Sequence, residues 1–290
     1  MQAGSPRVGW KAALLSLLLT PGLGHLYAGR PKRGAAFFCV ALAVAYTLVA
    51  LALFDALSAA SYGTVLAMLL AVRMASVVDA VRIARSAGSA YQLRRYNRWY
   101  AYVGATLVAS LLVLPTRLVA RPYRIPSGGM LPTVQIGDYI ITNSIAYPRT
   151  PPARGDVVVF RYPRNRDETY IKRIIGLPGE TIAIHQRRVS VNGQEIDDPW
   201  GFCPDGRSVG DRAADCGPPI ARADEMAPTT LRADEYFVLG DNRMRSQDSR
   251  FWGALPKADL LGKVVGVCWS WDAEQLRMRL DRIGLALDRS

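Results

Sequence analysis

Histidine is the scarcest chemically versatile residue in this chain of 290 residues, which contains only His25 and His185. Two histidines do not supply a His-rich metal site, and a Ser-His-Asp triad would depend on a single imidazole. We therefore expect no metal and no organic cofactor. Any catalysis by this chain has to use another group as its base.

Cysteine is also scarce, with four residues in the chain. Cys39 lies in an apolar run and Cys268 in a strand-like stretch, and neither has a metal-ligand spacing. Cys203 and Cys216 lie in a loop-like segment without Cys-x-x-Cys spacing, which disfavours zinc. They form a disulfide if the segment lies in an oxidising compartment, and two unpaired surface thiols are the alternative.

Acidic residues are nearly absent from the first 120 residues, which carry 2 Asp and Glu against 12 Lys and Arg. The rest of the chain carries 22 against 24, so the net charge of +12 belongs almost wholly to the first part. Its basic residues lie in short clusters between apolar runs rather than on one polar domain. We therefore expect no nucleic-acid partner.

Three charge-free stretches in the first part, at 34–54, 56–72 and 99–116, have the length and apolar character of membrane-spanning helices. Basic residues precede and follow the first two stretches, and the turn between them has none. The positive-inside rule then predicts a polytopic membrane region at 1–98 with basic cytoplasmic loops. It also predicts a last transmembrane anchor at 99–120, with everything beyond on the outer face.

Two features of the membrane region stay open at this level. The apolar segment Ala12–Leu19 is short enough to be a short span, a re-entrant turn or an interfacial helix. Arg73 and Asp79 interrupt the second stretch toward its cytoplasmic end. There Arg73 can extend to the interface and Asp79 can pair with Arg82, three residues further along a helix.

Residues 121–290 consist of short β-rich runs bounded by Gly, Pro and Asp, which predict a β-dominated domain. Asn192-Gly193 lies between alternating apolar flanks and predicts a tight hairpin. The closing stretch 273–287 has the pattern of a short helix.

Three blocks in this domain are 123–133 (YRIPSGGMLPT), 170–179 (YIKRIIGLPG) and 240–250 (GDNRMRSQDSR). In this order, after a spanning helix, they resemble bacterial signal peptidase I, the membrane Ser/Lys protease family that removes signal peptides from exported proteins. The charge-free stretches predict a multi-helix transmembrane N-terminal half, which exceeds the one or two anchors common in the family, and the resemblance implies a β-dominated signal peptidase-type catalytic domain after it. We therefore expect a multi-pass protein of the bacterial inner membrane, with the catalytic domain on the periplasmic face. The implied partners are signal peptides of precursor proteins, membrane lipid and the protein export machinery.

The resemblance assigns roles to individual residues. Lys172 matches the general base, which must be neutral near pH 7 and therefore buried. Ser127 matches a hydroxyl of the oxyanion hole, and Ser246 matches the serine that orients the lysine. The remaining matched positions are the bracing pair Asp248 and Arg250, the supporting Asp241 and Asn242, and the substrate-pocket residues Ile125, Met130 and Ile171.

The sequence departs from the family at the position of the nucleophilic serine, which is Gly129. Glycine has no side chain to attack a carbonyl, so the acyl-enzyme route is closed there. Three explanations remain open: Ser127 acts as a displaced nucleophile, the chain binds peptides without cutting them, or a serine of an ordinary enzyme has been changed to glycine.

Overall fold

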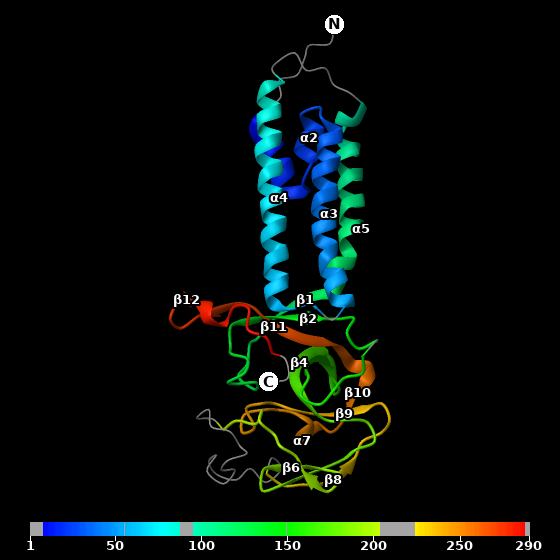
Figure 1. Cartoon of the computed structure of the whole chain (residues 1–290), viewed down its shortest axis with the longest axis vertical. Coiled ribbons are helices and arrows are strands. Elements are labelled where there is room, and N and C mark those ends of the chain that lie inside the picture. Colours follow the sequence, from blue (N-terminus) through cyan, green and yellow to red (C-terminus); the bar gives the residue numbers. More distant parts are fainter. Residues whose placement is uncertain (1–7, 55, 88–94, 149, 204–223, 288–290) are drawn as a thin grey trace. The chain divides into compact units, whose positions relative to one another are not determined.

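The computed structural model describes residues 8–54, 56–87, 95–148, 150–203 and 224–287. The chain divides into a helical unit, residues 1–56 and 61–120, and a β-rich unit, residues 57–60 and 121–290 (Figure 1). A multi-helix first part followed by a β-dominated domain is the predicted fold class, which is thus confirmed.

The helical unit begins with short elements. The α-helix α1 (Gly9–Leu14) runs into the π-helical turn η1 (Leu15–Leu19), and after a break comes α2 (Leu23–Tyr27). The apolar segment Gly9–Leu19 is shorter than a spanning helix. The 3-10 turn η2 (Arg95–Asn97) precedes the last helix of the unit.

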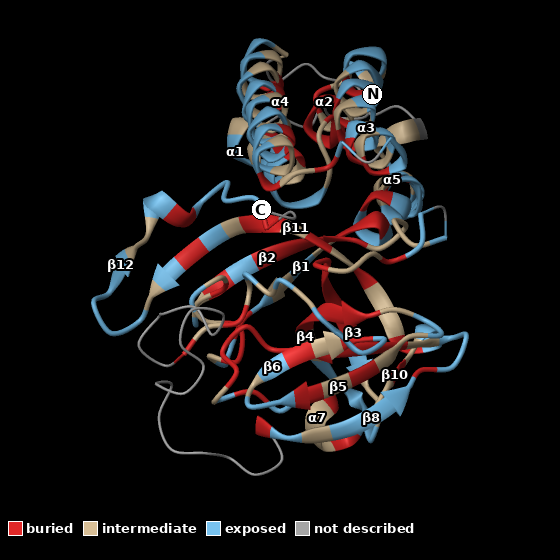
Figure 2. Cartoon of the chain, turned by 60° about the horizontal axis from the view of Figure 1, so that its bottom comes forward, coloured by how far each residue is buried: buried red, intermediate tan, exposed pale blue. Residues whose placement is uncertain are grey.

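Three helices of the unit are long and apolar enough to cross a membrane. They are α3 (Pro31–Leu53), α4 (Ala59–Ser86) and α5 (Trp99–Val119). Each contains one of the predicted charge-free stretches or nearly all of it. Their outward faces keep large apolar side chains exposed, such as Leu107 and Leu111 on α5, which a lipid environment would cover (Figure 2).

The β-rich unit is built on two antiparallel sheets. Among the described residues, the larger sheet has eight strands in the order β1-β2-β11-β3-β4-β9-β10, with β12 paired to β11. Its strands are β1 (Ala120–Arg124), β2 (Asp138–Asn143), β3 (Val157–Tyr162), β4 (Asn165–Gly176), β9 (Glu235–Leu239), β10 (Leu255–Pro256), β11 (Leu260–Asp272) and β12 (Arg277–Met278).

The smaller sheet has the order β7-β6-β5-β8. Its strands are β5 (Thr181–His185), β6 (Arg188–Val191), β7 (Gln194–Glu195) and β8 (Met226–Thr230). The predicted hairpin at Asn192-Gly193 is confirmed, because both residues have positive φ and Val191 pairs with Gln194 across the turn. Short helical turns lie at α7 (Ser249–Trp252), η4 (Lys257–Asp259) and η5 (Leu280–Arg282).

Buried apolar side chains form clusters on both sides of the larger sheet, whose central strands are mostly buried in Figure 2. One cluster includes Ile125, Ile140 and Val159, and another includes Phe160 and Val238. This burial fixes the register of the strands that carry the site, because a slip of one residue would turn every core side chain to the opposite face.

The prediction of a helix in the closing stretch 273–287 is wrong. The chain there forms β12 and the 3-10 turn η5 instead. Arg282 explains the difference, since its guanidinium donates to both carboxylate oxygens of Asp138 at 2.7–3.1 Å. That pairing with β2 ties the segment to the sheet, and it is a long-range contact that helical periodicity does not encode.

Candidate active site

Position 129 lies in the loop that leaves β1. Ile125 is buried, Ser127 is exposed and Gly129 is buried within this loop. Two hydrogen bonds from Asn242 hold it: the amide Nδ2 donates to the carbonyl oxygen of Gly128 at 3.1 Å, and the backbone N–H donates to that of Gly129 at 3.2 Å. The loop is therefore fixed against the segment that follows β9.

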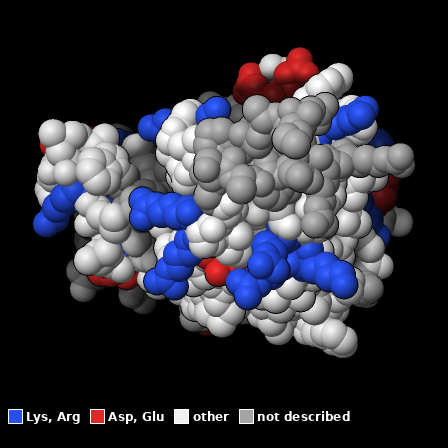
Figure 3. All heavy atoms as spheres, turned by 90° about the horizontal axis from the view of Figure 1, so that it is seen from above, with Lys and Arg blue, Asp and Glu red and all other residues white. Residues whose placement is uncertain are grey.

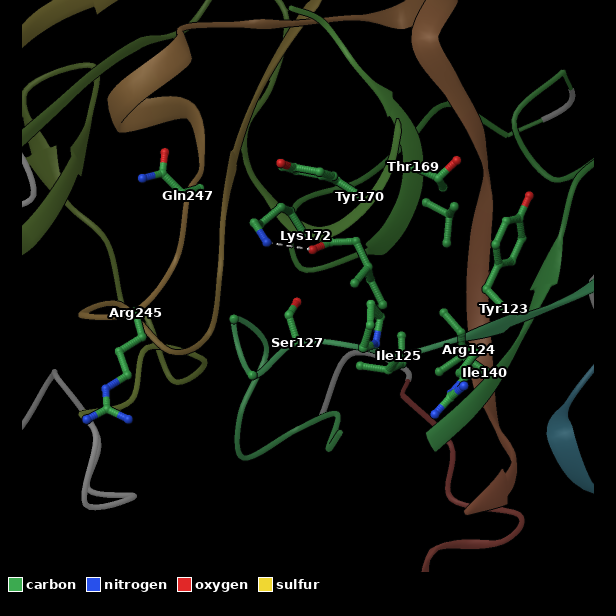
Figure 4. A pocket seen from close by; sticks show the side chains of 15 residues that line it. Tyr123, Arg124, Ile125, Ser127, Ile140, Thr169, Tyr170, Lys172, Arg245 and Gln247 are labelled. Atoms are coloured by element: carbon green, nitrogen blue, oxygen red, sulfur yellow. Dashed lines mark hydrogen bonds between the residues drawn. The ribbon is translucent and has the colours of Figure 1, made fainter. Parts of the chain in front are cut away.

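Lys172 lies in the middle of β4, where it pairs with Val158 of β3. Its side chain is only 6% exposed. The Nζ atom donates to the carbonyl oxygen of Ile171 at 3.0 Å and lies 5.7 Å from the centre of the Tyr170 ring (Figure 4). Among the described residues this carbonyl is the one hydrogen-bond partner of the amine.

Burial lowers the pKa of the Lys172 amine below its ordinary value of 10.5. The carboxylates of Asp248 and Asp241 act in the opposite direction, and the guanidinium of Arg250 lowers the pKa further. Desolvation is the dominant cause, as expected for a charge removed from water. The amine is therefore easier to deprotonate than an exposed lysine, as a general base requires.

The side-chain position of residue 129 points at this amine. A Cβ atom built on Gly129 would lie 3.3 Å from Nζ of Lys172 and 3.8 Å from Oγ of Ser246. The φ angle of Gly129 is not positive, so the backbone accommodates an ordinary L-residue there. A serine at this position would bring its hydroxyl within hydrogen-bonding reach of the amine after a shift of a few tenths of an ångström.

Ser246, in the segment after β9, also lies beside the side-chain position of residue 129. It is 7% exposed, and its Oγ has no hydrogen-bond partner among the described residues. Gly240 makes room for it, because a Cβ on Gly240 would lie 2.1 Å from Oγ of Ser246 and 2.4 Å from the carbonyl oxygen of Gly129. The close approach of these segments therefore depends on a glycine at 240.

Two buried ion pairs hold the segments that carry the site. Asp248 binds Arg250 through both carboxylate oxygens at 2.8 Å, and its Oδ2 also accepts the N–H of Gly240 at 3.1 Å. Asp241 binds the guanidinium of Arg173 at 2.9 and 2.7 Å. Bidentate pairs of this kind fix orientation as well as charge.

A pocket of about 500 Å³ opens over the site (Figure 4). Ser127, Gly129 and Lys172 line it together with the predicted substrate-pocket residues Ile125 and Ile171. The described residues therefore bring most of the predicted site together in one place.

Met130 differs from this expectation. It is 1% exposed, packs in the core cluster and is not among the described residues that line the pocket. It lies one residue beyond Gly129, where the loop turns inward.

Sequence reasoning missed several residues of the site. Arg173, the partner of Asp241, stands next to Lys172 in the matched block, but the pair spans 68 residues and nothing in either segment indicates it. Arg243 is likewise buried and ion-paired with Asp198. The pocket is also lined by Tyr123, Tyr170 and Gln247, which lie in the matched blocks without an assigned role, and by Ile140, Val159 and Thr169 outside the blocks.

The predicted disulfide is only partly within the described residues. Cys203 is buried and disulfide-bonded, whereas Cys216 lies outside the described residues. Cys39 and Cys268 are free.

Comparisons with known proteins show which family this chain resembles in sequence. The family model described as signal peptidase, peptidase S26, matches residues 97–269. Signal peptidase I of Leptolyngbya laminosa is 34% identical over 174 residues, 58% of this chain and 76% of that protein. Signal peptidase I of Pseudomonas aeruginosa is 32% identical over 203 residues, 56% of this chain and 68% of that protein.

Among solved structures, a signal peptidase I from Enterococcus faecalis V583 is 28% identical, with a TM-score of 0.30. The match covers 39% of this chain and 97% of that chain.

Proposed function

Because this chain belongs to the signal peptidase family, peptidase S26, we propose that its pocket receives the signal peptides of exported precursor proteins for cleavage. Members of the family are membrane-bound serine endopeptidases, and therefore hydrolases, that remove signal peptides. The observation that carries the proposal is the direction of residue 129, whose Cβ position faces both Lys172 and Ser246.

The proposed chemistry is acyl transfer by a Ser/Lys pair. A hydroxyl oxygen attacks the scissile carbonyl carbon while the neutral amine of Lys172 takes the hydroxyl proton. The proton then passes to the leaving amine, and water hydrolyses the ester that remains. The backbone N–H of Gly129 and the hydroxyl of Ser127 are the proposed donors to the oxyanion.

The proposed substrate preference is the one that the family resemblance implies, which is Ala-x-Ala before the cleavage site. The apolar side chains of Ile125, Ile140, Val159 and Ile171 in the pocket wall are compatible with it.

A second candidate function is peptide binding without cleavage, and Gly129 favours it. The attacking hydroxyl of the first step is absent at this position. The hydrogen bonds from Asn242 to Gly128 and Gly129 oppose the loop movement that Ser127 would need to replace it.

A precursor peptide with Ala-x-Ala before its cleavage site, incubated with the full chain in detergent, tests both candidates. Binding is followed by fluorescence anisotropy and products by mass spectrometry, with a Leu-x-Leu peptide as the control. Cleavage that disappears in Lys172→Ala, together with an acyl group found on Ser127 by mass spectrometry, identifies Ser127 as the nucleophile rather than an oxyanion donor alone. Selective binding without products identifies the second candidate. Equal binding of both peptides contradicts the proposed function altogether.

The proposed placement in the membrane is multi-pass. The basic clusters on either side of the α3–α4 hairpin support a cytoplasmic location for its ends, and the β-rich unit then lies on the outer, periplasmic face. Membrane lipid and the export machinery are proposed partners in this setting. Protease added outside sealed spheroplasts should degrade the β-rich unit, and full protection would contradict this orientation.

A further inference from the structure

The glycine-rich segment 21–34 of the helical unit has no place in the peptidase site, yet it is closely packed. A Cβ on Gly22 would lie 2.1 Å from the carbonyl oxygen of Gly34, and a Cβ on Gly24 would lie 2.2 Å from that of Ala12. The N–H of Gly22 also donates to Oγ of Ser76 at 3.0 Å. The segment therefore ties α2 to the start of α3 and to α4.

This packing positions a charged cluster between α3 and α4. His25 is fully buried, its ring stacks on Phe37 at 4.9 Å between ring centres, and its Nε2 lies 2.9 Å from Oδ2 of Asp79. The other oxygen of Asp79 lies 3.6 Å from Nη1 of Arg33. The expected partner of Asp79, Arg82, is thus replaced by two residues that a local helix pattern cannot reveal.

A cavity of about 820 Å³ opens beside this cluster. Its walls are mainly apolar side chains of α3 and α4, including Val40, Val72 and Val78. Arg33, Asp79 and Arg82 are its charged lining residues. Val40 is 51% and Val78 45% exposed, so the cavity is open at its side.

The charge balance of the cavity is positive. Among the described residues, Asp79 is the one acidic residue that lines it and is already bound by His25, whereas Arg33 and Arg82 are both exposed. Arg33 keeps 64% of its side chain exposed and is 3.6 Å from Asp79, so guanidinium donors remain for a ligand. Lys and Arg side chains are prominent on the face seen from above (Figure 3).

We propose that this cavity binds an anionic phospholipid, with its phosphate at Arg33 and Arg82 and an acyl chain along Val40, Val72 and Val78. Guanidinium groups bind phosphate oxygens in a bidentate manner, and basic pockets between spanning helices suit anionic headgroups. The apolar walls suit an acyl chain rather than a free anion. The proposal is independent of the peptidase function.

Native mass spectrometry of the full chain in detergent tests the headgroup contact. The probes are phosphatidylglycerol and phosphatidylcholine with identical acyl chains. The double variant Arg33→Gln/Arg82→Gln should lower phosphatidylglycerol binding about tenfold or more. The control Arg30→Gln/Arg85→Gln removes the same charge from exposed residues outside the cavity lining and should retain binding.

Equal binding of the two lipids, or equal loss in both double variants, would overturn the proposal and leave only general attraction to a basic surface. Inorganic phosphate that displaces phosphatidylglycerol at millimolar concentration would also overturn it, because a free anion would then satisfy the site.

A second variant tests the acyl-chain contact without touching a charge. Val78→Trp should fill the open cavity and lower phosphatidylglycerol binding, whereas Val103→Trp, on the exposed face of α5, should not. Both positions are about half exposed, so neither change disturbs a packed core. Unchanged binding in Val78→Trp would contradict the proposed path of the acyl chain.

Discussion

The two units of the chain use basic side chains in opposite ways. In the β-rich unit, Lys172 is 6% exposed and burial lowers the pKa of its amine. In the helical unit, Arg33 beside an apolar cavity is 64% exposed. Burial suits the proposed role of Lys172 as a base, whereas exposure leaves the planar guanidinium of Arg33 accessible to the proposed anionic ligand.

The largest expected effect comes from supplying the hydroxyl that the buried amine faces. Gly129→Ser should cleave an Ala-x-Ala precursor at least about 10³-fold faster than the unaltered chain, because loss of a nucleophile removes most of a protease's rate. Single-turnover cleavage in detergent, followed by mass spectrometry, measures the gain.

The control is Gly129→Ser combined with Lys172→Met, which keeps a side chain of similar length without a base. This double variant should return to the rate of the unaltered chain. A Gly129→Ser variant no faster than the unaltered chain would show that the residues around position 129 do not support Ser/Lys chemistry.

The next effect concerns the contribution of the buried Arg173–Asp241 ion pair to the stability of the β-rich unit. Arg173→Ala should destabilise the β-rich unit by about 3–5 kcal/mol, because it leaves the buried carboxylate of Asp241 without its partner. Arg188→Ala removes the exposed pair with Glu195 and should cost less than about 1 kcal/mol. Urea unfolding followed by tryptophan fluorescence compares the two, and equal losses would contradict the distinction between buried and exposed charge.

The smallest effect is a change in pH dependence, measured in the Gly129→Ser background. The rate should rise as Lys172 loses its proton, with the midpoint below the ordinary pKa of 10.5. The Asp248 carboxylate raises the pKa of Lys172, so Asp248→Asn should move the rising limb to lower pH. Arg250 lowers this pKa, so Arg250→Gln should move the limb to higher pH.

Both of these variants break the same ion pair, so a merely structural effect would change the two profiles alike. Shifts in the same direction would therefore contradict an electrostatic role for the pair.

The sequence predicted those parts of the fold that depend on local pattern. Charge-free stretches located α3, α4 and α5, and Asn192-Gly193 located a hairpin. The sequence did not predict that α4 continues to Ser86 with Asp79 held by His25, 54 residues away. It also misjudged residues 273–287, where Arg282 is bound to Asp138.

In the candidate site too, local motifs were predictable and long-range pairings were not. The matched blocks located Lys172, Ser127 and Ser246, because a motif keeps chemically active residues at fixed spacing. Pairings such as Arg173 with Asp241 join segments far apart in the chain, and only the folded sheet brings them together.

The most direct test of the buried-base interpretation is titration of the Lys172 amine itself. With lysine labelled by ¹³C at Cε in the full chain, NMR follows each amine with pH, and Lys172→Met assigns the signal. A Lys172 signal that titrates clearly below 10.5 is the predicted result. A signal that titrates at or above that value would contradict the account, because the amine would remain charged where a base is needed.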